Sequence, residues 1–148
     1  MKNLLLTLAI VFSYSLNAQF AVMSAVDLAD GGEEDYLALE EFFAEINKEA
    51  VKQGLQSGQS VWKRTPKEGD QDSAPEYFII NTYSSMEQMQ QGINWQELAQ
   101  KVYKGKMSRR AISRMLDNSN YSAEKERRSY VLKVVDATIR AGGKIKKG

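Results

Sequence analysis

Residues 76–84 read EYFIINTYS, and this stretch is the strongest strand signal in the chain. Its side chains fall into two alternating sets, which are Phe78, Ile80 and Thr82 on one side and Tyr77, Ile79, Asn81 and Tyr83 on the other. Successive side chains of a strand point to opposite faces of a sheet, so this strand is apolar on both of its faces. The pattern therefore predicts a strand whose sheet needs cover on both sides.

Three further stretches alternate in the same way and predict three more strands. The first comprises residues 59–65 and is terminated by Pro66. The polar loop 66–75 suits a hairpin connection to the strand that follows it. Residues 20–28 alternate near the start of the chain, and residues 128–139 alternate near its end.

Helical spacing separates these strands. The apolar stripe of a helix over residues 33–53 consists of Tyr36, Leu39, Phe42, Phe43, Ile46 and Ala50. Asp30 and Glu33 resemble a capping box at the start of this helix, and Gly54 is placed to end it.

Shorter helical pieces are predicted after residue 84. Ser85, Asn94 and Ser108 are placed as their N-caps, and Gly92 and Gly105 are placed to interrupt them. The order strand, helix, strand, strand, helices, strand is typical of the α+β class and of the ferredoxin-like β-α-β-β-α-β fold. It predicts an antiparallel four-stranded sheet with helices on one face.

One layer of helices covers only one of two apolar sheet faces. The simplest cover for the other face is a second copy of the same sheet, so we expect a homodimer in the form of a dimeric α/β barrel.

The first residues, MKNLLLTLAIVFSYSLNA, have the layout of a secretory signal peptide. Lys2 supplies a positive charge, residues 4–12 form an apolar core, and Ala18 is a small residue at the expected cleavage point. The apolar core is shorter than the roughly 20 residues that span a bilayer. A buried N-terminal strand or an uncleaved anchor is the alternative.

The chain is therefore predicted to comprise a signal peptide (residues 1–18), a ferredoxin-like domain (residues 19–139) and a flexible basic tail (residues 140–148). We expect the mature protein in the periplasm or secreted space of a bacterium, without a stable membrane anchor.

The composition excludes several kinds of chemistry. The chain has no cysteine and no histidine, so it has no disulfides, no Ser-His-Asp machinery and none of the usual zinc, haem or iron–sulfur ligands. Asp70 and Asp72 are two carboxylates in a polar loop, and they lack the remaining ligands of a calcium loop. We predict no cofactor, no metal site and no catalytic residue.

Charge is divided unevenly along the chain. Residues 19–100 hold 15 acidic and 5 basic side chains, whereas residues 101–148 hold 4 acidic and 14 basic side chains. The basic part suits nucleic acid or anionic lipid, or it pairs with the acidic part within the fold or across a dimer. The formal net charge of +1 favours the second interpretation, so we expect no nucleic-acid partner.

The chain resembles the dimeric α/β-barrel superfamily, which includes the antibiotic-biosynthesis monooxygenases. The resemblance covers about residues 19–139, and its most pointed element is Asn81, Tyr83 and Ser85, a polar residue, an aromatic residue and a small helix cap. Many members carry a histidine on the next helix. This chain has none, which argues against monooxygenase activity and against histidine-ligated haem.

In such a fold a ligand cleft lies between the sheet and the helices. The candidate ligand-binding residues are Trp62, Arg64, Tyr77, Asn81, Tyr83 and Trp95, with Tyr103 beside them. Aromatic walls with one arginine and one asparagine suit a planar or anionic small molecule. The alternative is that these aromatic residues belong to the core or to a dimer interface.

Three functions are compatible with the sequence. We favour an exported dimeric binding or structural module without catalysis. The alternatives are a cofactor-independent monooxygenase or isomerase that acts on a small aromatic or quinone-like compound, and a nucleic-acid or anionic-surface binder. Whether the chain is an enzyme is left open by the sequence.

Overall fold

The computed structural model describes residues 20–69, 74–118, 124–135, 138–141 and 144–147. The elements follow one another as β1 (Phe20–Leu28), α2 (Glu33–Lys52), β2 (Gly58–Lys63), β3 (Tyr77–Tyr83), α3 (Met86–Gln90), α4 (Trp95–Val102), α5 (Arg109–Asn118), β4 (Glu124–Lys133), β5 (Thr138–Ala141) and β6 (Lys144–Lys147).

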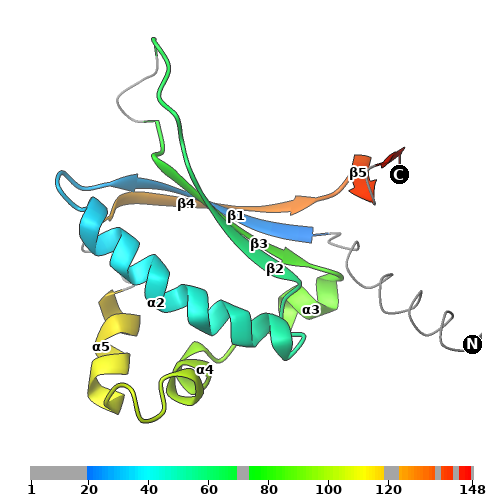
Figure 1. Ribbon diagram of the computed structural model, residues 1–148. Helices are drawn as coiled ribbons and strands as arrows, with labels where there is room; N and C mark the ends of the chain where they lie inside the picture. The colour runs from blue at the N-terminus through cyan, green and yellow to red at the C-terminus, as the bar shows by residue number, and fades with distance from the viewer. Residues whose placement is uncertain (1–19, 70–73, 119–123, 136–137, 142–143, 148) are drawn as a thin grey trace, which may run out of the picture.

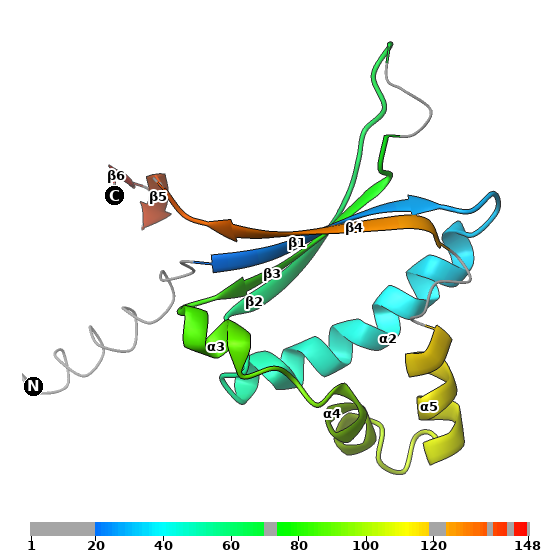
Figure 2. The same ribbon diagram turned by 180° about the vertical axis from the view of Figure 1, so that it is seen from behind.

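Strands β1 to β4 form one antiparallel sheet in the order β2-β3-β1-β4. Helices α2 to α5 lie on the same side of this sheet (Figures 1 and 2). The first strand lies between the third and the fourth, which is the arrangement of the ferredoxin-like fold. The predicted α+β fold class and helix placement are therefore confirmed.

The register separates the two faces of the sheet. Val26 of β1 lies opposite Tyr77 of β3, and both pack against Tyr36 of α2, so their side of the sheet is the inner, helix-covered face. The alternate positions form the outer face. Its large side chains are Met23, Trp62, Phe78, Ile80, Tyr130 and Leu132.

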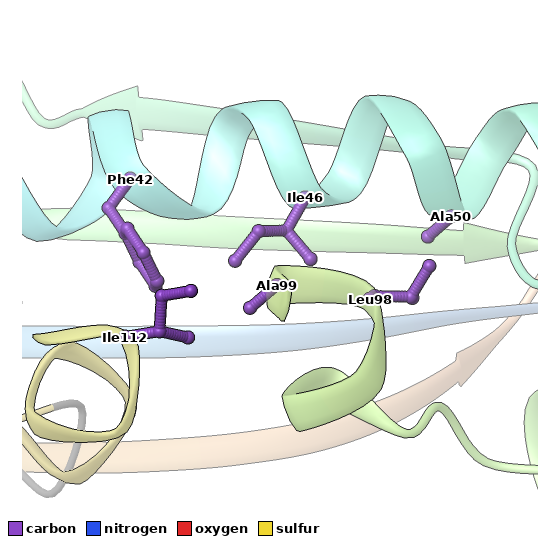
Figure 3. Close-up of a cluster of buried hydrophobic side chains, with 6 residues drawn as sticks. All are labelled: Phe42, Ile46, Ala50, Leu98, Ala99 and Ile112. Atoms are coloured by element: carbon purple, nitrogen blue, oxygen red, sulfur yellow. The ribbon is translucent and has the colours of Figure 1, made fainter. Parts of the chain in front are cut away.

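A second cluster of buried side chains holds the helices to one another. Phe42, Ile46 and Ala50 of α2 meet Leu98 and Ala99 of α4. Ile112 of α5 completes the cluster (Figure 3). Helix α2 thus packs against the sheet on one side and against α4 and α5 on another.

Three of the four predicted helix N-caps are confirmed. Ser85 and Asn94 accept hydrogen bonds from the backbone amides of Gln88 and Glu97, and Ser108 accepts one from Ala111. Gly92 and Gly105 take positive φ angles of 71° and 77° at the predicted interruptions, a conformation that glycine adopts at little cost.

The predicted capping box at Asp30 is wrong. The N-cap of α2 is Gly32, which makes no side-chain cap hydrogen bond. The amide of Gly32 donates to the carbonyl of Ala29 in a tight turn, so Asp30 lies outside the helix. The acidic first turn, Glu33 to Asp35, still suits the positive end of the helix dipole.

The ends of the outer strands also differ from the prediction. Strand β4 covers Glu124–Lys133 rather than 128–139, because it pairs with β1 along the whole length of β1, from Leu28 opposite Glu124 to Phe20 opposite Lys133. Strands β5 and β6 pair in a separate two-stranded sheet that begins at Thr138 and extends into residues 140–148, where a flexible tail was predicted.

The predicted strand 59–65 is shorter than expected, since β2 ends at Lys63. The predicted signal peptide lies outside the described residues. Within the described part of the chain, no helix is both long and apolar enough to cross a membrane.

Replacing Ile46 by alanine tests the helix core. Ile46 is fully buried, so Ile46→Ala should lower the free energy of unfolding by about 2–5 kcal/mol. Leu37→Ala is the matched control on the same helix, because Leu37 is 47% exposed and should cost about 0.5 kcal/mol or less. Urea unfolding followed by circular dichroism measures both, and equal losses would contradict the packing described.

Candidate functional site

A cavity lies between the inner face of the sheet and the helices, and its volume is about 410 Å³. Helix α2, helices α4 and α5, and three strands contribute its lining. The lining residues are Leu39, Glu40, Phe43, Asn47, Gln59, Ile79, Asn81, Trp95, Gln96, Leu116 and Arg127. Cavities of this size suit small organic ligands.

Two carboxamides lie side by side on the sheet side of the cavity. Gln59 of β2 and Asn81 of β3 are directly opposite each other in the antiparallel register. Side chains in such a pair have Cβ atoms about 5 Å apart. Among the described residues, neither carboxamide makes a hydrogen bond, so both offer their donors and acceptors to the cavity.

Aromatic side chains form part of the opposite wall. Phe43 of α2 and Trp95 of α4 meet edge to face, with ring centroids 6.1 Å apart and planes at 85°. Trp95 is the first residue of α4, and the Asn94 cap fixes where that helix begins. Cap and ring contact together set the position of Trp95 at the cavity.

A buried amide pair orients the polar side of α2. Nε2 of Gln56 donates to Oδ1 of Asn47 over 2.7 Å, and Nδ2 of Asn47 donates to the carbonyl of Phe43 over 2.9 Å. Gln56 is only 1% exposed, so the pair is held away from solvent. Within the described residues, Oε1 of Gln56 has no hydrogen-bond partner.

The charged groups at the cavity balance. Glu40 of α2 and Arg127 of β4 line it, and they are its only ionisable lining residues among those described. Both take part in interactions within the chain. The cavity therefore presents no net charge to a ligand.

The structure brings only part of the predicted site together. Asn81 and Trp95 line the cavity. Tyr77 and Tyr83 share the inner face of β3 with Asn81, but both are buried and neither lines the cavity.

Trp62 and Arg64 lie elsewhere. Trp62 belongs to the outer face and is 60% exposed. Nε of Arg64 donates to the carbonyl of Pro75 at the base of the hairpin. Tyr103 stacks on Phe42 and donates from its hydroxyl to the Phe42 carbonyl, so it is a core residue. The predicted set therefore does not form one cleft, because alternation along β2 turns Trp62 away from the helices.

Sequence reasoning missed most of the cavity lining. Gln59 is the residue with a usable signal, since the register of the hairpin places it opposite Asn81. Asn47 was also detectable as a polar residue beside the apolar stripe of α2, next to Ile46. Gln96 and Arg127 carried no such signal, because their place depends on tertiary packing.

A charged cluster lies at the N-terminal end of α2, outside the cavity lining. The Tyr77 hydroxyl and the Lys63 ammonium group both donate to Oε1 of Glu33. Both hydrogen bonds lower the pKa of Glu33, and the one from Lys63 has the larger effect. Burial, followed by the hydrogen bond to Glu33, raises the pKa of Tyr77. The cluster ties α2 to strands β2 and β3.

Known proteins show little similarity to this chain. No family model and no curated protein matches it. One similar solved structure is a dimeric protein of unknown function and ferredoxin-like fold from Bacteroides fragilis, with 10% sequence identity and a TM-score of 0.44. The match covers 79% of this chain and 97% of that one.

Substituting Glu33 tests the charged cluster. The pKa of Glu33 is lower in the folded protein, so its stabilising contribution is present above its unfolded pKa near 4.5 and is lost as the pH falls through the folded pKa. Glu33→Gln should therefore lower the urea midpoint at pH 7 and flatten its decline on acidification.

Glu34→Gln is the matched control in the same helical turn. Urea midpoints between about pH 7 and about pH 3 measure the effect. The cluster has no stabilising role if both variants follow the wild-type curve. Because the Glu33 side chain is half exposed, the expected change is small.

Proposed function

We propose that this protein is an exported homodimer that joins two sheets by their outer faces and binds a small molecule without transforming it. The observation that carries the proposal is the outer face itself. The described helices lie on the inner side of the sheet (Figures 1 and 2). The outer side carries exposed large apolar side chains, including Trp62, Tyr130 and Leu132. An extended apolar surface of this kind marks an interaction site.

The exposed fractions of these side chains support the pairing of sheets. Trp62 is 60% exposed, Tyr130 is 45% exposed and Leu132 is 42% exposed, and they come from the two edge strands. Burying the exposed apolar part of one such side chain contributes about 1–2 kcal/mol. Nε1 of Trp62 already donates to Oγ of Ser60 within the chain, so burial of this ring leaves its polar atom satisfied.

The last part of β4 exposes further apolar surface at the edge of the sheet. Val131 is 62% exposed on the other face of this edge strand, and Val134 and Val135 beyond it are 47% and 98% exposed. A long apolar edge strand is an aggregation hazard unless another chain covers it. A second copy that covers the outer face and this edge would bury both the outer-face side chains and the valines in and just after β4. Such a pairing of sheets is the dimeric α/β-barrel arrangement.

Binding is favoured over catalysis by the positions of two residues. The monooxygenase or isomerase alternative requires Tyr83 to move a proton beside Asn81. Asn81 lines the cavity and Tyr83 does not. A nearby cation could lower the pKa of Tyr83, but Arg64 binds the Pro75 carbonyl at the other end of β3. In fact burial raises the pKa of Tyr83.

Export is the second part of the proposal and rests on the sequence of residues 1–18. A positive residue, an apolar core and a small residue at the expected cleavage point follow one another there. Removal of this segment leaves a chain that begins close to β1, so processing does not cut into the sheet. The periplasm or the secreted space of a bacterium is the proposed location.

Tyr130→Asp tests the dimer. A charge on the outer face would be buried without a partner in the dimer, so this variant should sediment as a monomer at micromolar concentration while the wild type sediments as a dimer. Leu37→Asp is the matched control, because Leu37 of α2 is 47% exposed but lies away from the outer face. A wild type that is monomeric throughout would contradict the proposal.

N-terminal sequencing tests export. Expression of the full chain in a bacterium should yield a periplasmic or secreted protein that begins near Gln19. Replacing Leu5 by arginine within the apolar core should keep the protein in the cytoplasm with its N-terminal segment intact. Recovery of the wild type only from the cytoplasm, with Met1 or Lys2 at its start, would exclude export.

A further inference from the structure

We propose that the cavity on the inner face binds a neutral ring compound that carries a hydrogen-bond donor and a hydrogen-bond acceptor side by side. Cyclic ureides and sugars with vicinal hydroxyl groups share this chemistry. The inference rests on the proposed binding function and specifies its ligand.

The pair of carboxamides on the sheet determines the hydrogen-bonding pattern. Gln59 and Asn81 lie opposite each other, line the cavity and make no side-chain hydrogen bond among the described residues. Each carboxamide has a carbonyl oxygen that accepts and an amide group that donates. Two adjacent carboxamides therefore match a ligand edge on which donors and acceptors alternate over a few ångströms.

Hydrogen bonds within the chain hold two other polar side chains of the lining, Asn47 and Gln96, and so help to define the shape of the cavity. Both polar atoms of the Asn47 side chain are hydrogen-bonded, to Gln56 and to Phe43. Nε2 of Gln96 on α4 donates to Oγ of Ser113 on α5 over 3.3 Å. Groups held in this way are preorganised, which lowers the entropic cost of binding.

The charges argue for a neutral ligand. Arg127 and Glu40 carry opposite charges and are already engaged within the chain. An anionic ligand would meet the Glu40 carboxylate, and a cationic ligand would meet the Arg127 guanidinium. A neutral ligand avoids both of these like-charge repulsions.

The apolar walls of the cavity favour a ring-shaped ligand. Phe43 and Trp95 stand at 85° to each other, and Leu39, Ile79 and Leu116 supply further apolar surface. Aromatic and aliphatic walls bury the apolar faces of a ring, while its polar edge reaches the carboxamides. The volume of about 410 Å³ is at the small end of ligand cavities.

Four probes distinguish this proposal from its alternatives. Uracil is the cyclic ureide and methyl glucoside is the sugar, whereas benzoate is an anionic ring and toluene is a ring without hydrogen-bonding groups. Titration calorimetry on the exported protein, at millimolar probe concentration, measures binding. At least one of the first two probes should bind more tightly than both benzoate and toluene, and the one that binds identifies the source of the ligand chemistry.

Variants then locate the site. Gln59→Met and Asn81→Leu retain side-chain size and remove hydrogen bonds, so each should weaken binding by about fivefold or more. Gln90→Met on α3 is the matched control and should bind as the wild type does. Circular dichroism establishes that each variant is folded.

The failures of the two proposals are distinguishable. Tighter binding of benzoate or toluene, or binding that Gln59→Met and Asn81→Leu leave unchanged, would overturn the neutral-ligand proposal while leaving a binding module in place. Absence of binding by all four probes would overturn both this proposal and the small-molecule part of the proposed function, and sedimentation would still decide the dimer.

Discussion

The sheet carries apolar side chains on both of its faces, and the helices of the described residues lie on only one of them. Val26, Tyr77 and Ile79 are buried on the inner face by Tyr36 of α2. On the outer face the side chains of Trp62, Tyr130 and Leu132 keep between 42% and 60% of their surface exposed. Exposed surface of this kind is costly in water, and this cost is the physical basis of the proposal that a second chain covers the outer face.

The single layer of helices also gives rise to the cavity. Helix α2 lies on the sheet, and Ile46 and Ala50 on this helix bury the apolar sides of α4 and α5. Because α4 and α5 pack on α2, the space between them and the sheet is not filled by their core side chains. Asn81 and Gln59 face this space from the sheet, and Trp95 borders it from α4. The cavity and the exposed face are thus two consequences of a single helix layer built around α2.

Much of this fold follows from local sequence. Alternation located β1, β2 and β3 to within a few residues, and helical spacing located α2, because their buried sides are marked by large apolar residues. Strand β4 was harder to place, since its first half reads Glu124-Lys-Glu-Arg-Arg128 and carries no apolar alternation. That half is a strand because it pairs with β1, which is a tertiary cause.

The site was less predictable for the same reason. Asn81 and Trp95 were found because they lie in patterned segments, whereas Arg127 and Gln96 reach the cavity only through the arrangement of β4 and α4. Trp62 was misplaced because an aromatic residue on a strand fits a cleft or an interface equally well. Its face depends on register, and the register of β2 against β3 turns it outward.

The central claim is that a second copy covers the outer face, and Trp62 reports on it directly. The chain has two tryptophans, so in a Trp95→Phe variant all indole emission comes from Trp62. At high micromolar concentration we predict a blue-shifted emission that acrylamide quenches poorly, as expected for a ring buried between two sheets. Solvent-like emission with full quenching at every concentration would show that Trp62 stays as exposed as it is in the single chain, and would contradict the account.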